Sequence, residues 1–336
     1  MKDFWKGYQG KDWELTLPRE SFGRTLVALG KENPRIVVLD ADLSASTLTK
    51  YFHAEFPERS FDMGIAEQDL VGTAAGLAAT GFIPFCSTYA MFLAGRAWEQ
   101  IRNAVAYSGW NVKLAAAHGG ISVGKDGPTH QSMEDIALMR SIPGMTVIVP
   151  ADAHETARLV RWAADYDGPV YFRMGREKVP VVTSEDDLFE HGKAMTLREG
   201  DDATIIAAGL LVSKALEAAE LLEKDGISAR VLNMHTIKPI DRDAIAKASR
   251  ETGVIVTAEE HNLHGGLGDA VAQVAVQEER PPRMRYVAVQ DRYMDSGPPE
   301  ELMELAGLTA ENIARQVHSA LASGSKAAPL GGERTS

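Results

Sequence analysis

The feature that most restricts the possible folds of this chain is the repeated alternation of short apolar runs with helical patterns. Strand-like runs occupy residues 36–39, 82–86, 112–116, 146–149 and 170–172, then 203–208, 229–232, 254–257 and 286–289. Helical patterns occupy residues 19–30, 68–80, 90–107, 154–165, 211–224, 242–250, 267–276 and 311–321. Parallel strands joined by right-handed helical crossovers form a sheet that is covered on both faces. The sequence therefore predicts an α/β fold with two doubly wound, mainly parallel sheets.

The alternation is interrupted once, near residues 179–187, where Pro180, Thr183 and an acidic run break the pattern. We therefore expect a first domain over residues 18–180 and a second over 188–322. Residues 1–17 are polar with interspersed aromatic residues, and we interpret them as an N-terminal arm that lies on a neighbouring molecule. Residues 323–336, rich in Gly, Ser and Ala, are typical of a flexible tail.

The net charge and the cysteine content restrict the binding partners and the cellular compartment that we expect for this chain. The formal net charge is −12 at pH 7, which argues against nucleic acid or an anionic membrane as a general partner. One cysteine, Cys86, excludes an internal disulfide and fits a reducing compartment, so we expect a cytoplasmic protein. Neither a signal peptide nor an apolar run long enough to span a bilayer is visible.

Polar clusters follow four of the predicted strands directly, at residues 40–46, 87–92, 118–130 and 173–176. In open parallel sheets, ligands bind beyond the carboxyl ends of the strands. These clusters therefore predict one shared site at the edge of the first sheet.

Glu67 stands at the start of the predicted helix 68–80, where the helix dipole favours an ionised carboxylate. Gly72 and Gly76 leave one side of that helix thin, so that another backbone could approach closely. A lone glutamate at a helix start usually faces water, but at an interface it needs a partner. The neighbouring motifs favour the second interpretation.

Aromatic and histidine side chains accompany the first clusters. We expect residues 87–92 to open a helix on which Tyr89 and Phe92 share one face, either packed in the core or forming a wall for a flat heteroaromatic ring. The loop 118–131 carries four glycines with His118, Asp126 and His130, and its spacing does not match a zinc site.

An arginine pair follows the last strand of the first region. Arg173 and Arg176 could clamp a phosphate or carboxylate, or could form surface ion pairs with the many acidic residues.

Several of these segments together resemble a known family. Residues 65–68, 84–89, 96–102, 118–131 and 236–241 resemble the pyrimidine-binding domain of transketolases, and residues 259–268 resemble the family's C-terminal domain. The resemblance runs from about residue 19 to residue 321. It implies a thiamine-diphosphate enzyme that transfers a two-carbon ketol unit from a ketose phosphate to an aldose phosphate.

One departure from the family pattern concerns the diphosphate. Transketolases hold it through Mg²⁺ with a Gly-Asp-Gly … Asn motif, which is absent here; Gly200-Asp201-Asp202 comes nearest but lacks the later glycine. The chain therefore resembles the C-terminal half of a split transketolase. The resemblance implies that an N-terminal subunit supplies the Mg²⁺ and diphosphate ligands, in an α2β2 assembly.

The resemblance also implies roles for individual residues. The catalytic residues would be Glu67, which sets the tautomer of the aminopyrimidine, and His118. Tyr89, Phe92 and His130 would line the aminopyrimidine, His118 and Asp126 would contact sugar hydroxyls, and Arg19, Ser46 and Arg176 would hold the sugar phosphate. We expect structural roles for His235, His261 and His264.

Three alternatives remain open at this point. A 1-deoxyxylulose-5-phosphate synthase shares several motifs but carries a different residue where His118 stands. A 2-oxo acid dehydrogenase β subunit also lacks the diphosphate motif, although the set of His118, Asp126 and Arg176 points away from it. A non-catalytic regulatory or binding subunit could have kept the same fold.

Overall fold

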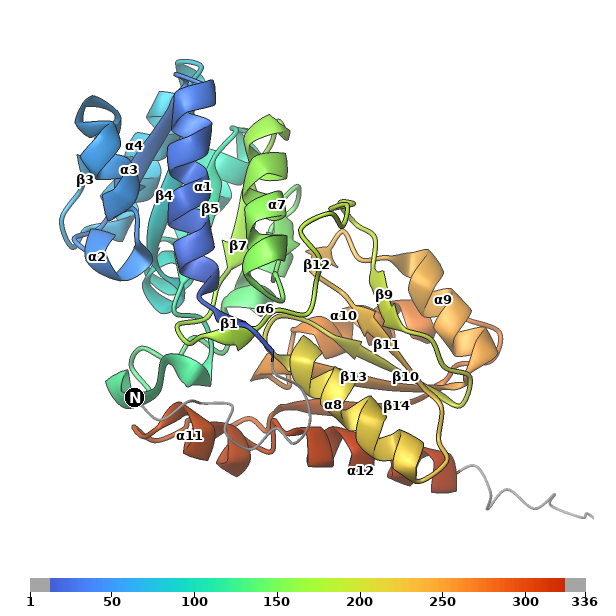
Figure 1. Cartoon of the computed structure of the whole chain (residues 1–336). Coiled ribbons are helices and arrows are strands. Elements are labelled where there is room, and N and C mark those ends of the chain that lie inside the picture. The colour runs from blue at the N-terminus through green and yellow to red at the C-terminus, as the bar shows by residue number, and fades with distance from the viewer. Residues whose placement is uncertain (1–12, 324–336) are drawn as a thin grey trace, which may run out of the picture.

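The computed structural model describes residues 13–323, which form two sheets flanked by helices and lying side by side (Figure 1). The first sheet has seven strands in the order β12-β6-β7-β5-β4-β2-β3 and the second has five in the order β14-β13-β10-β11-β9. All neighbouring pairs are parallel except β12 with β6 and β9 with β11. The predicted α/β class with two mainly parallel sheets is confirmed.

The bounds of the strands are as follows. The first sheet contains β2 (Ile36–Asp40), β3 (Ser60–Asp62), β4 (Ile83–Tyr89), β5 (Lys113–Ala117), β6 (Thr146–Ile148), β7 (Val170–Arg173) and β12 (Thr236–Lys238). The second contains β9 (Met195–Arg198), β10 (Ala203–Ala207), β11 (Ala229–Asn233), β13 (Val254–Asn262) and β14 (Arg283–Val289). A separate two-stranded ribbon pairs β1 (Leu15–Thr16) with β8 (Val179–Pro180).

The helices that accompany the first sheet are α1 (Pro18–Glu32), α2 (Ser44–Thr47), α3 (Lys50–Glu55), η1 (Pro57–Arg59), α4 (Glu67–Ala79), η2 (Met91–Arg96), α5 (Trp98–Gln100), η3 (Ile101–Tyr107), η4 (Ile121–Asp126), α6 (Asp135–Arg140) and α7 (Ala153–Asp165). Those of the second sheet are α8 (Leu211–Lys224), α9 (Arg242–Glu251), α10 (Leu267–Ala275), α11 (Pro299–Ala306) and α12 (Ala310–Ala322).

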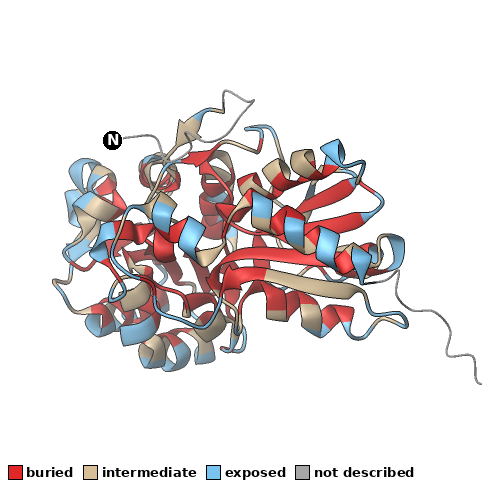
Figure 2. Ribbon diagram, turned by 90° about the horizontal axis from the view of Figure 1, so that it is seen from below, coloured by how far each residue is buried: buried red, intermediate tan, exposed pale blue. Residues whose placement is uncertain are grey.

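Alternate residues of the central strands point to opposite faces and bury themselves in different cores. In β2, Ile36 and Val38 pack with α1, α3 and α7, whereas Val37 and Leu39 pack with α4 and the helical segment that follows β4. Figure 2 shows the strands largely buried and the exposed residues gathered on the outer sides of the helices. Both faces are therefore covered, as a parallel sheet requires.

The two sheets share one apolar core. The cluster on the α4 side of the first sheet continues into residues of α9, α10 and the second sheet, including Ile206, Ile245, Ile255 and Val271. The antiparallel strand β12 also crosses from the second half of the sequence to the edge of the first sheet. The sequence pattern did not predict β12 as a strand, because its one apolar residue, Ile237, stands between Thr236 and Lys238 and forms no apolar run.

The predicted helical opening at residues 87–92 is wrong in its first half. Ser87, Thr88 and Tyr89 extend β4, where they pair with β5, and the helix begins only after them. The following helix is also irregular, because π-helical turns at η2 and η3 flank the short α5. π-turns are uncommon and concentrate at functional sites.

The segment that connects the two regions, residues 181–194, contains neither helix nor strand. The predicted arm and tail fall mostly on residues 1–12 and 324–336, which lie outside the described residues. The part of the arm that is described pairs with this chain itself, through Leu15 and Thr16. Among the residues described, none of the helices combines the length and apolar character needed to cross a bilayer.

Glu155 is a buried carboxyl group that links the two regions. It accepts hydrogen bonds from Ala151 N (2.6 Å) and from Asn233 Nδ2 (2.8 Å), and burial raises its pKa from 4.5 to about 7. The folded protein therefore binds more protons at this position than the unfolded chain between these two pH values. The stability that Glu155 contributes is present below pH 4.5 and is lost as the pH rises through about 7.

We expect Glu155→Gln to remove this pH dependence. As the pH rises from about 5 to about 8, the unfolding temperature of the wild-type chain should fall relative to that of the variant. Thermal unfolding followed by circular dichroism at several pH values measures the shift. A difference that stays constant with pH would contradict the assignment.

Candidate active site

Four neighbouring strands of the first sheet end at one edge and carry the predicted polar clusters. β2, β4, β5 and β7 are parallel and adjacent, so Asp40, Tyr89, Ala117 and Arg173 stand at their carboxyl ends. The loops that follow them meet there, as predicted from the sequence.

Glu67 is the first residue of α4, and its carboxylate is buried against an arginine. Arg96 Nη1 lies 2.8 Å from Glu67 Oε2, and the two side chains are 48% and 2% exposed. The guanidinium of Arg96 also lies over the ring of Phe92, at 4.7 Å from its centroid. Glu67 thus meets the predicted need for a partner, and Arg96 connects it to the aromatic residues.

Four rings form a cluster beside this ion pair. Tyr89 stacks on His118 at 4.0 Å between centroids and on Phe92 at 6.0 Å. His130 meets Phe92 edge-on at 5.1 Å and Tyr89 at 6.1 Å. Tyr89, Phe92 and His130 are each only partly buried, so the ring cluster forms a wall that remains accessible.

Two arginines close the other end of the site. Arg19 Nη1 donates to Ser46 O at 2.6 Å, and its Nε donates to Arg176 O at 3.3 Å. Arg176 Nη1 lies 3.1 Å from Asp126 Oδ1 and donates to Val123 O at 2.7 Å. Arg19 and Arg176 place two positive charges together and half-buried in an acidic chain, an arrangement that favours an anionic ligand.

His118 lies between the ring cluster and the arginines. Burial, together with the charges of Arg19 and Arg176, lowers the pKa of its imidazole from 6.5 to about 3. The ring is therefore neutral near pH 7. Its Nδ1 atom is buried without a hydrogen-bond partner, so a ligand could satisfy it.

The structure brings the predicted site residues into one connected set, with the exception of Arg173. Arg173 is buried, lies 3.1 Å from Asp135 Oδ2 and donates to the carbonyl oxygens of Ser132 and Glu260. The interpretation of Arg173 as half of an anion clamp is therefore wrong. Of these two arginines, only Arg176 faces the site, because the guanidinium of Arg173 is bonded to groups inside the protein.

The three histidines of the second half lie elsewhere. His235 is buried, faces Phe189 and bonds Thr236 Oγ1 at 2.8 Å, and burial lowers its pKa to about 4. His261 accepts from Ala137 N at 3.3 Å, and His264 is exposed near Asp291.

Two residues that contact the site were not predicted as functional. Arg96 lies within a segment that resembles transketolases, and a cation one helical turn after Phe92 was the available signal. Glu260 contacts the loop after β5 from the second half of the sequence, and no local pattern could have indicated that contact.

Comparisons with known proteins identify the family of the chain. Residues 18–182 match the family model described as "Transketolase, pyrimidine binding domain", and residues 192–313 match "Transketolase, C-terminal domain". The chain is 48% identical over 301 residues to a "Putative transketolase C-terminal section" of Methanocaldococcus jannaschii, covering 89% of this chain and 94% of that relative. The chain belongs to the transketolase family.

Two further relatives show which part of a transketolase this chain corresponds to. It is 43% identical to a "6-deoxy-6-sulfo-D-fructose transketolase subunit" of a Clostridium species, covering 89% of this chain and 93% of that relative. A solved structure described as "Split gene transketolase, inactive beta4 tetramer" superposes with a TM-score of 0.84 at 52% identity, covering 91% of this chain and 98% of that one. The chain is thus a C-terminal transketolase subunit that corresponds in length to these separate subunits.

The family implies dependence on thiamine diphosphate, and the site residues fit one half of that coenzyme. A buried carboxylate and an aromatic wall suit a flat aminopyrimidine with ring nitrogens and an amino group. For the diphosphate, residues 13–323 contain no group of three or more His, Cys, Asp or Glu side chains that could hold a metal ion.

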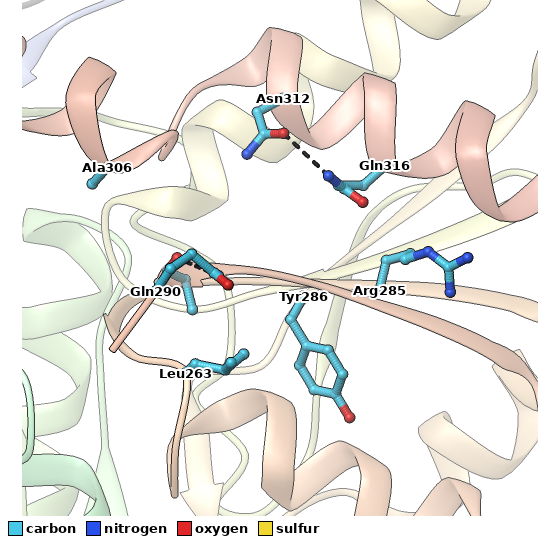
Figure 3. Close-up of a pocket in the computed structure, with 8 residues that line it drawn as sticks. Leu263, Arg285, Tyr286, Gln290, Ala306, Asn312 and Gln316 are labelled. Carbon is cyan, nitrogen blue, oxygen red and sulfur yellow. Dashed lines mark hydrogen bonds between the residues drawn. The ribbon is translucent and has the colours of Figure 1, made fainter. Parts of the chain in front are cut away.

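A separate pocket of about 440 Å³ lies in the second half of the subunit, between β14 and α12 (Figure 3). Its lining residues are Leu263, Arg285, Tyr286, Ala288, Gln290, Ala306, Asn312 and Gln316. None of them belongs to the candidate active site, so the pocket plays no part in the arrangement described above.

We expect His118 to stay neutral from pH 8 down to about pH 5, because burial and two cations oppose its protonation. NMR of a chain labelled in the histidine rings measures this, with His118→Asn to assign the signal. Arg176→Gln should raise the midpoint of the His118 titration, because it removes one nearby positive charge. A wild-type midpoint at or above 6.5 would contradict the electrostatics of the site.

Proposed function

We propose that this transketolase subunit forms the pyrimidine-binding and sugar-binding half of a ketol-transfer site, completed by a separate N-terminal subunit. The observation that carries the proposal is the placement of buried Glu67 beside an aromatic wall, with two arginines at the far end of the same site. These two ends suit a coenzyme ring and an anionic sugar, respectively.

Glu67 acts on the aminopyrimidine. A buried carboxylate that faces a ring nitrogen holds or accepts the proton there and so fixes the tautomer of the ring. When bound, thiamine diphosphate supplies the carbon nucleophile that carries the two-carbon unit. Tyr89, Phe92 and His130 hold the ring plane, and Arg96 Nη1, 2.8 Å from Glu67 Oε2, orients the carboxylate.

The sugar lies along the opposite side of the site. A neutral His118 can donate a hydrogen bond to a sugar hydroxyl or accept one from it. Because the imidazole is already neutral, it can accept a proton from that hydroxyl without first releasing one of its own. Asp126 accepts from a further hydroxyl. Arg19, Ser46 and Arg176 hold the anionic end of the sugar, which is a phosphate in the proposed substrates.

The partner subunit supplies what this chain lacks. The similarity to a structure described as an inactive beta4 tetramer supports the view that C-terminal subunits need a second chain for activity. We assign the Mg²⁺ and diphosphate ligands to that N-terminal subunit, in an α2β2 assembly. The two halves of the coenzyme are then bound by different polypeptides.

Reconstitution tests this function. The chain, mixed with an N-terminal-half transketolase subunit, thiamine diphosphate and Mg²⁺, should exchange ketol units between a ketose phosphate and an aldose phosphate. Glu67→Gln should lower kcat by about 100-fold or more, because the tautomer is no longer controlled. Glu99→Gln, an exposed carboxylate in α5, is the matched control. Full activity of this chain alone, or normal turnover by Glu67→Gln, would refute the proposal.

Arg176→Ala should raise the KM for phosphorylated sugars by roughly 10- to 100-fold, since it removes a charge-assisted contact to the anion. The KM for an unphosphorylated ketose should change little. Arg161→Ala, which removes an exposed arginine paired with Glu32, is the control. Equal losses for both kinds of sugar would show that Arg176 does not bind the phosphate.

A further inference from the structure

The motif at the end of β13 has no part in the function proposed above. Successive side chains of a strand point to opposite faces, so Glu259 and His261 share one face and Glu260 takes the other. Glu259 accepts from the N–H groups of Leu267 (2.6 Å) and Gly268 (2.8 Å) at the start of α10. Glu260 points instead into the first half of the chain.

Glu260 contacts the loop that carries His118. Its Oε1 accepts from Ser122 N at 2.6 Å, and its carboxylate is buried. Gly120 adopts φ +89, and a Cβ there would lie 2.2 Å from the Glu260 carboxylate. The carboxylate and the loop backbone are therefore in direct contact, with no room for a side chain between them.

Arg173 supports the contact between Glu260 and the loop through hydrogen bonds to backbone carbonyl groups. It donates to Glu260 O at 2.8 Å and to Ser132 O at 3.1 Å, while Asp135 balances its charge. A Cβ on Gly119 would meet Arg173 Nε at 2.2 Å. The loop thus rests on a buried layer of charges shared by both halves of the chain.

The second half of the chain also holds the outer side of this loop. Ser296 Oγ donates to Lys125 O, and Gln131 Nε2 donates to Asp295 O at 3.0 Å. Asp126 lies between these two attachments, and His118 precedes the contact with Glu260. The loop is therefore fixed at several points by residues that do not themselves face the site.

We infer that Glu260 is a positioning residue for sugar binding, which acts through the Ser122 N–H to fix the loop that carries His118 and Asp126. A charge-assisted hydrogen bond to a buried amide is stronger than a neutral one. Its loss frees the loop, and small displacements of binding groups weaken productive binding strongly. The sugar-binding part of this inference rests on the proposed function, whereas the effect on the loop does not.

Hydrogen exchange measured by mass spectrometry on the full chain tests the effect on the loop. Glu260→Ala should speed exchange of the amides in residues 119–131 by about tenfold, and Glu260→Gln, which keeps one acceptor oxygen, should do so less. Glu259→Gln is the matched control, because it alters an equally buried carboxylate of the same strand. It should speed exchange at the start of α10 and leave the loop unchanged.

Equal acceleration of the loop by Glu260→Ala and Glu259→Gln would overturn the inference, because it would indicate general destabilisation. Should Glu260→Ala fail to fold, Glu260→Gln decides: unchanged exchange in the loop would also overturn it.

Kinetics of the reconstituted complex test the consequence for binding. Glu260→Ala should raise the KM for the ketose by about tenfold, with kcat and thiamine diphosphate affinity within about twofold of wild type. A fall in coenzyme affinity with an unchanged KM would overturn the inference. A wild-type complex without ketol transfer would instead refute the proposed function, and the exchange experiment would still test the loop.

Discussion

The arrangement of the site depends on one buried carboxylate, Glu67, whose only charged partner among the described residues is a half-exposed arginine. Glu67 lies almost wholly out of water, and the Arg96 guanidinium that pairs with it is half exposed. A buried carboxylate without such a partner would carry a large desolvation cost. Arg96 offsets part of that cost, and it lies on the same side of the helix as Phe92, four residues earlier in the sequence.

The two ends of the site differ in their ionisable groups: a carboxyl group lies at one end and two arginines lie at the other. The Glu67 end places a carboxyl group beside an aromatic wall, and the Arg19 and Arg176 end gathers cations around a neutral His118. The rings and charges come from segments that follow several strands of the first sheet, and the parallel sheet brings those segments together at one edge. The relatives include a subunit named for a sulfonated sugar, whose anionic group differs from a phosphate. An arginine pair can in general bind either anion.

Much of the fold followed from periodicity, and the errors have identifiable causes. All nine predicted strands exist, because each carries enough β-branched or apolar residues to give a clear signal. Ser87–Tyr89 was misjudged, since polar residues at the end of a buried strand look like a helix start. Short strands such as β12 depend on partners far away in the sequence. The position of the loops that carry the candidate residues was predictable from the strand ends, but the inward turn of Arg173 depends on Asp135 and Glu260, which only the folded chain brings near.

The strand that crosses from one half of the chain to the other has a consequence for how the molecule comes apart. β12 belongs by sequence to the second half, yet it completes the edge of the first sheet, and a common apolar core joins the two sheets. Cutting the connecting segment would not yield two independent modules, because each piece would expose apolar surface and the first would lose its outermost strand. Both halves should accordingly melt as a single cooperative unit.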